Sequence, residues 1–157
     1  MMDHHALKVF ILEAKRATHA AGDRATQVKE FDGSISLWYE KGSFKYHDNY
    51  FGGEPYGGRE VVWLRGKPIW MMTYYGSVSE NFSDVKNLYA FLRDTLLRGR
   101  VEEPYRGPSQ YEKDSWIYTN NVTGNIRCFS GVEKISKDNI FIYEASYMGG
   151  FINIRKG

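Results

Sequence analysis

Three groups that can exchange protons lie on either side of a glycine-rich segment. His47 and Asp48 precede Gly52-Gly53, and Glu60 follows Gly57-Gly58. Carboxyl and imidazole groups are the usual general acids and bases of enzymes. Because successive residues of a strand point to opposite faces, His47 and Asp48 can share one pocket only where a bulge intervenes. The pattern argues against a dyad of these two residues and leaves each of the three groups open as a single acid or base.

Aromatic side chains surround the same segment and can supply binding surface. Phe, Trp and Tyr make up 16% of the chain, and such side chains favour both half-buried sheets and ligand contacts. We therefore expect a binding site where the strand ends flank the glycines. Its candidate residues are Tyr46, Asp48, Tyr50, Glu60, Trp70, Tyr74 and Tyr75.

Motifs of other reaction classes are absent from the sequence. It contains no phosphate-binding lysine loop, nucleophile elbow, metalloprotease helix or dinucleotide fingerprint. The four histidines show no spacing typical of metal ligands, and the single cysteine, Cys128, can form no internal disulfide. We expect Cys128 to be buried, since free cysteines favour the core. Neither a metal ion nor a cofactor is predicted.

Basic and acidic residues nearly balance. The chain has 21 Lys and Arg against 19 Asp and Glu, a formal net charge of +2, which is too small to attract nucleic acid through the overall field. Basic residues do gather near the end of a predicted helix, where cations stabilise the helix dipole; they are Arg93, Arg98, Arg100 and Arg106. Nucleic acid is therefore not an expected partner.

No segment predicts export or membrane insertion. The N-terminal residues lack a cationic stretch followed by an apolar one, and no apolar run approaches the length of a membrane span. We therefore expect a cytoplasmic protein that does not contact a membrane.

Two helices must help to position the candidate site. Apolar residues recur at three- and four-residue intervals over residues 3–21, with Asp3 as a cap and Gly22 as the end. Lys15 and His19 fall outside this apolar stripe, so we expect them in solvent.

The second predicted helix runs from a cap at Ser83 to Gly99. Strands are predicted where apolar residues alternate or run between turn signals; they cover residues 35–40, 44–51, 59–64, 69–75, 116–119, 126–129, 140–147 and 151–154. Residues 52–58 are predicted to be a loop, and residues 101–113 a long connection. Apolar residues on both faces of 59–64 and 69–75 predict central strands that are covered on both sides.

These elements predict an α+β fold. Two main helices pack on a largely antiparallel, curved sheet of seven to eight strands, and residues 1–157 form a single domain. Residues 43–53 echo residues 140–150 in the order of Phe, Tyr, Tyr, Gly and Gly. The echo suggests a weak internal duplication, although aromatic strands that end in glycines also arise independently in such sheets.

Four stretches of the chain resemble an uncharacterised family of prokaryotic domains. They are Glu13–Ala20, Tyr50–Gly53, Glu60–Trp63 and Trp70–Gly76, and they occur in the family's order. Thr73 stands where the family has asparagine. The family occurs alone or C-terminal to helix-turn-helix regulatory domains, so the resemblance implies a sensory or accessory role and assigns no catalytic residue.

Three functions are compatible with these observations. The first is a non-catalytic domain that binds a small ligand or another protein at the aromatic, glycine-rich centre. The second is a hydrolase-like or transferase-like enzyme that uses Asp48, Glu60 or His47 as acid or base. The third is a structural module that forms a homodimer through exposed aromatic side chains.

Overall fold

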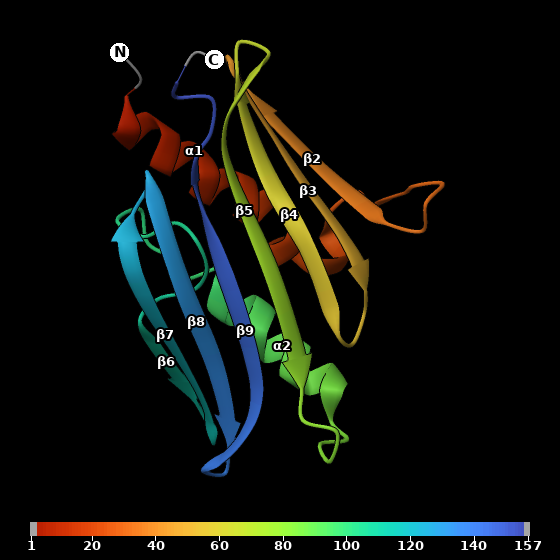
Figure 1. Cartoon of the computed structure of the whole chain (residues 1–157). Helices are drawn as coiled ribbons and strands as arrows, with labels where there is room; N and C mark the ends of the chain where they lie inside the picture. Colours follow the sequence, from red (N-terminus) through yellow and green to blue (C-terminus); the bar gives the residue numbers. More distant parts are fainter. Residues whose placement is uncertain (1–2, 156–157) are drawn as a thin grey trace.

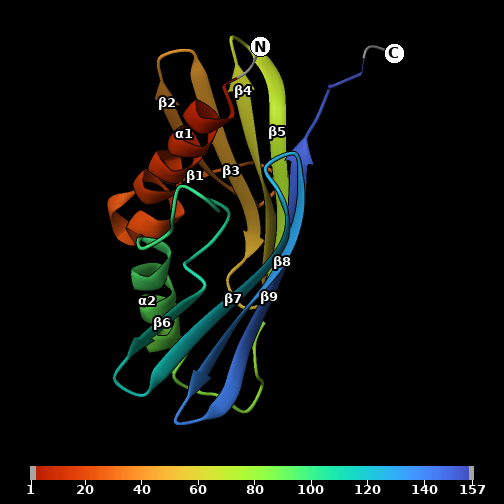
Figure 2. The ribbon, with the colours of Figure 1, turned by 90° about the vertical axis from the view of Figure 1, so that its left-hand side faces the viewer.

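Both α-helices lie on the same face of one open antiparallel sheet (Figures 1 and 2). The computed structural model describes residues 3–155, with the backbone alone at residues 23 and 24, so the ends of the predicted domain lie outside the described residues. The strands within this range are β1 (Val28–Lys29), β2 (Ile35–Lys41), β3 (Phe44–Gly52), β4 (Tyr56–Leu64), β5 (Lys67–Val78), β6 (Gln110–Lys113), β7 (Trp116–Asn125), β8 (Cys128–Lys137) and β9 (Ile140–Phe151).

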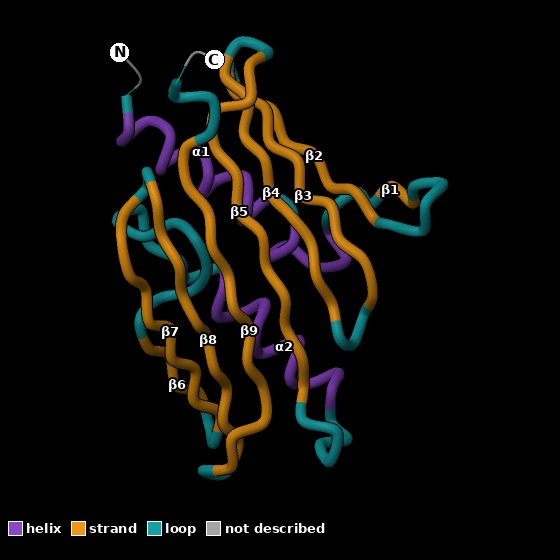
Figure 3. Tube along the Cα trace, in the orientation of Figure 1, coloured by secondary structure: helices purple, strands orange, loops and turns teal. Residues whose placement is uncertain are grey.

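The chain builds the sheet as two meanders that meet at the centre. The strand order is β1-β2-β3-β4-β5-β9-β8-β7-β6, so β5 pairs with β9, and β1 and β6 form the edges (Figure 3). The predicted α+β class, with two helices on an antiparallel sheet, is confirmed, but the described residues form nine strands instead of seven or eight. The echoing segments 43–53 and 140–150 fall on β3 and β9, which hold different places in this order.

Helix α1 (His4–Ala17) begins as the sequence predicts. The Asp3 carboxylate accepts hydrogen bonds from the backbone N–H groups of His5 and Ala6. The apolar stripe is buried against the sheet. The helix ends earlier than predicted, however, and the chain continues as a 3-10 helix, η1 (His19–Arg24), with φ of +60° at Gly22.

Helix α2 (Val85–Leu96) packs beside η1 on the same face (Figure 2). Leu88, Leu92 and Leu96 are buried there, as their four-residue spacing predicts. Asp84, and not the predicted Ser83, precedes the first turn, and its side chain makes no capping hydrogen bond.

Four sequence expectations about the strands were wrong. Only residues 53–55 turn between β3 and β4, so Gly57 and Gly58 belong to β4. The connection 101–113 ends in strand β6, residues 126 and 127 form the turn before β8, and no separate strand follows β9 within the described range. Cys128 is the first residue of β8 and is exposed, because it alternates with buried Phe129 and so lies on the face of the sheet that the helices do not cover.

The sheet has one face covered by helices and one open face. The helix-covered face carries the core, which includes Tyr46, Val62, Trp70 and Met72. The open face carries Tyr75 and Met148, whose exposed fractions are 59% and 62%. The central strands are therefore covered on one side, and not on both as expected, because both helices pack on the same face of the sheet (Figure 2).

Candidate functional site

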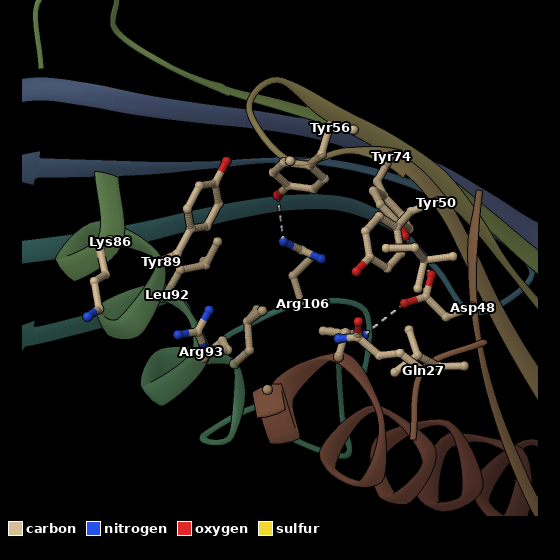
Figure 4. Close-up of a pocket in the computed structure, with 17 residues that line it drawn as sticks. Gln27, Asp48, Tyr50, Tyr56, Tyr74, Lys86, Tyr89, Leu92, Arg93 and Arg106 are labelled. Atoms are coloured by element: carbon tan, nitrogen blue, oxygen red, sulfur yellow. Dashed lines mark hydrogen bonds and ion pairs between the residues drawn. The ribbon is translucent and has the colours of Figure 1, made fainter. Parts of the chain in front are cut away.

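A cavity of about 520 Å3 opens between the helix-covered face, η1 and α2. Tyr50 and Tyr74 line one end of it, and Tyr89 and Leu92 of α2 line the other (Figure 4). Arg106 projects into the space between these ends (Figure 4). The lining therefore combines aromatic and apolar surface with a few polar groups, which is typical of a binding site.

Asp48 lies at the sheet end of the cavity and is only 1% exposed. The Tyr74 hydroxyl donates a hydrogen bond of 2.5 Å to its Oδ1 atom. Glu60 stands directly opposite on β4, so two carboxyl groups face each other across the strands. Burial, and next the negative charge of Glu60, raise the pKa of Asp48 to about 7. This carboxyl group therefore changes charge near neutral pH.

Glu60 is held by a buried cation from α1. The Lys15 ammonium lies 2.5 and 2.7 Å from the two Glu60 carboxylate oxygens, and it donates a further hydrogen bond of 2.7 Å to the Tyr105 carbonyl. Burial lowers the pKa of Lys15, whereas the Glu60 carboxylate opposes this shift. Lys15 is thus a buried partner of the sheet, and the expectation that it lies in solvent was wrong.

His19 completes the same polar cluster. Its Nδ1 atom lies 3.6 Å from Asp48 Oδ2 and 3.9 Å from Glu60 Oε1. Burial and the positive charges of Lys15 and Arg106 hold the pKa of His19 well below its usual range. The imidazole is therefore neutral at neutral pH, and its contact with Asp48 is not an ion pair there. The expectation that His19 lies in solvent was also wrong, since it lines the cavity.

Arg106 is fixed by a second buried network. Its Nη2 atom donates to Glu133 Oε1 at 2.5 Å and to the Tyr56 hydroxyl at 3.3 Å. Glu133 also accepts hydrogen bonds from Tyr118, at 2.7 Å, and from Tyr143, at 2.9 Å. Arg106 lies ten residues beyond the end of α2, so the prediction that it stabilises the helix dipole was wrong. Its position is explained by the ion pair with Glu133.

The structure separates the sequence candidates into three groups. Asp48, Tyr50 and Tyr74 line the cavity. Tyr46, Glu60 and Trp70 lie on the same face but deeper in the core, where the Trp70 ring stacks on Phe129 with centroids 5.7 Å apart. Tyr75 lies on the open face.

His47 lies on the open face as well. Its ring stacks on Trp38 with centroids 3.7 Å apart, and its Nε2 atom lies 2.8 Å from the Ser36 hydroxyl. Asp48 instead faces the cavity. The alternation of β3 therefore separates the two residues, as the sequence predicts.

Sequence reasoning missed Lys15, His19 and Arg106. A signal for the first two was present, since Leu7, Ile11, Lys15 and His19 follow one another at intervals of four residues. Positions at this interval lie along one side of a helix. No comparable signal marks Arg106, because its partner comes from a strand 27 residues further along the chain.

Residues 3–155 hold neither a cluster of metal ligands nor a helix that could span a membrane. There, no group of three or more His, Cys, Asp and Glu side chains is arranged to hold a metal ion. Over the same range, no helix has the length and apolar character needed to cross a membrane.

Fold and cavity together define an α+β protein in which a nine-stranded antiparallel sheet and two helices enclose a partly polar cavity. The chain belongs to the family described as "Domain of unknown function (DUF5680)", whose model matches residues 48–152. The matched segment begins at Asp48 and includes Arg106, while α1 and η1 precede it. No curated protein and no solved structure matches the chain.

Proposed function

We propose that the protein binds a small ligand in the cavity between the sheet, η1 and α2, and that binding is its function. The single observation that supports this proposal most is the cavity of about 520 Å3 that ends at Asp48. Ligand sites usually have volumes of about 300 to 1,000 Å3, with apolar walls and a few convergent polar groups.

The polar groups at the cavity are held in place before any ligand arrives. Asp48 is fixed by Tyr74, and Arg106 is fixed by Glu133 and Tyr56. Because these side chains are already ordered, binding costs little additional conformational entropy. Such an arrangement favours recognition of a defined small molecule.

The proposal can be tested by thermal-shift screening against metabolites and nucleotides. A ligand that binds only the folded state raises the melting temperature. For each hit, amide chemical shifts should change at Asp48, Tyr50 and Tyr74, and Asp48→Asn should alter the affinity. Tyr75→Phe on the open face is the matched control and should leave the affinity unchanged. The proposal would be contradicted if the compounds that raise the melting temperature change amide chemical shifts only on the open face.

A second candidate function is acid–base catalysis in the same cavity. It is favoured by the pKa of Asp48, which burial and Glu60 raise to about 7, since a general acid or base works best when its pKa lies near the ambient pH. His47 is left out of this function because it lies on the open face. Slow conversion of a bound ligand that Asp48→Asn abolishes would favour the enzyme over a pure binding domain.

The biological setting is part of the proposal. We propose a cytoplasmic protein in which ligand binding serves a sensory or accessory role. A homodimer through the open face is a further proposal, motivated by exposed Tyr75 and Met148. Sedimentation analysis of the wild type and of Tyr75→Ser tests the homodimer separately from ligand binding.

A further inference from the structure

Two cationic side chains of α2 line the cavity beside its apolar residues. Lys86 and Arg93 are seven residues apart, so they lie on the same side of the helix as Tyr89. Figure 4 shows both of them at the end of the cavity opposite Asp48. Among the described side chains, neither makes an ion pair or a hydrogen bond. Gly22 leaves room for Arg93, since a Cβ atom there would lie 3.0 Å from Arg93 Cδ.

The other charges around the cavity largely cancel. Arg106 is paired with Glu133, and Lys15 is paired with Glu60. Among the described side chains that line the cavity, the buried carboxyl group of Asp48 is the only acidic one. The α2 end carries two cations, Lys86 and Arg93, against one nearby carboxylate, Glu54, which accepts a hydrogen bond from the Tyr89 hydroxyl. This end therefore has an excess of positive charge, which attracts an anion and repels a cation.

A row of three tyrosines forms the wall between the two ends. The ring centroids of Tyr56 and Tyr74 are 6.0 Å apart, as are those of Tyr56 and Tyr89. All three hydroxyl groups already have protein partners: Tyr56 is hydrogen-bonded to Tyr143, Tyr74 to Asp48, and Tyr89 to Glu54. The rings therefore offer aromatic surface to a ligand, while their polar atoms are occupied.

From this arrangement we infer that the cavity takes an amphipathic anion. A ring-bearing apolar body lies along the tyrosine wall, and a single carboxylate or phosphate group is bound by Arg93, with Lys86 at the rim. Arginine suits this role because its planar guanidinium can donate two parallel hydrogen bonds to either group. The inference rests on the proposed function, because it names the ligand class of the same cavity.

Four compounds with one skeleton and different head groups test this inference on the wild-type protein. They are 4-phenylbutyrate, 4-phenylbutyl phosphate, 4-phenylbutan-1-ol and 4-phenylbutylamine, and their binding is measured by titration calorimetry and by amide chemical shifts. We expect the two anions to bind at least about tenfold more tightly than the alcohol, since a charge-assisted hydrogen bond adds more than a neutral one. We expect the amine to bind least.

A pair of arginine variants locates the anionic group. Arg93→Gln should weaken binding of both anions about tenfold or more and leave the affinity for the alcohol unchanged. Arg98→Gln removes the same charge just beyond the end of α2, where Arg98 contacts Asp94 and the Tyr111 ring outside the cavity. This control should bind all four compounds as the wild type does. Arg93→Lys, which keeps the charge, should retain much of the anion affinity.

The outcomes separate this inference from the function on which it rests. Equal or tighter binding of the alcohol or the amine, with shift changes at Asp48 and Tyr74, would show a ligand cavity of another class. If Arg93→Gln and Arg98→Gln weaken the affinity for the anions equally, Arg93 does not bind the anionic group. If none of the four compounds binds, the inference fails, and the broader thermal-shift screen decides whether the proposed function fails with it.

Discussion

Replacing Asp48 by asparagine should stabilise the protein at neutral and alkaline pH. The folded-state pKa of Asp48 is raised to about 7 by burial and by Glu60, whereas an unfolded aspartate titrates near about 4. The folded state therefore binds this proton more tightly than the unfolded state. As a consequence, the wild type loses free energy of unfolding as the pH rises from about 4 to about 7. Asparagine carries no titrating proton and avoids this loss.

The difference of about 3 pKa units corresponds to about 4 kcal/mol at about 1.4 kcal/mol per unit. Asparagine keeps an oxygen that can accept the hydrogen bond from Tyr74, so the substitution removes the charge and retains that contact. We therefore expect the two proteins to be similarly stable near pH 4. Asp48→Asn should be more stable by a few kcal/mol at about pH 8.

Urea unfolding of both proteins between about pH 4 and pH 9 measures this difference, because the free energy of unfolding extrapolates linearly to water. Asp32→Asn is a control for which we expect the opposite effect, a lower free energy of unfolding than that of the wild type at neutral pH. Hydrogen bonds from Ser34 lower the pKa of Asp32, so this exposed aspartate favours the folded state above its pKa. The reasoning about Asp48 is refuted if its variant shows a stability difference that does not change with pH, or if it is the less stable protein at pH 8.

Two further substitutions test the packing around the site. Lys15→Met should lower the free energy of unfolding by about 3 to 5 kcal/mol, because it leaves the Glu60 carboxylate buried without its cation; Glu60→Gln in the same chain should recover part of the loss in urea unfolding. Gly58→Ala should lower the free energy of unfolding by about 1 to 3 kcal/mol. A Cβ atom at this position would meet the Asn49 carbonyl oxygen and lie 2.7 Å from the Tyr74 hydroxyl. Gly53→Ala is its control and should be close to neutral in thermal melts, because nothing lies within 4 Å of its Cβ position.

Local periodicity is sufficient to predict most of the first half of the fold. Side chains of the strand around Tyr46 alternate between the two faces of the sheet, and the strand around Val62 is rich in apolar residues. Turn residues bound both strands, so both hairpins were predicted. The same alternation separated His47 from Asp48 correctly. Local signals of this kind depend only on neighbouring residues, which is why they can be read without knowing the tertiary contacts.

Strand β8 shows where such reading fails. Its buried positions include Phe129 and Ile135, but also Gly131 and Glu133, so apolar residues do not alternate along it. Gly131 leaves space that the Tyr147 ring fills, and Glu133 receives the Arg106 guanidinium. Both residues are suited to their positions by partners that lie elsewhere in the sequence. The hydrophobic pattern therefore placed a strand at residues 126–129, too early in the chain.

The sequence by itself determined the class of fold, the two helices and the region of the candidate site around Asp48, because these follow from short-range periodicity and turn residues. Only the tertiary structure decided which charges meet there. Lys15 pairs with Glu60 across 45 residues, and Arg106 pairs with Glu133 across 27. Such pairs form because burial makes an unpartnered charge costly. Which partners meet depends on where a helix crosses the sheet, and sequence spacing does not encode that crossing.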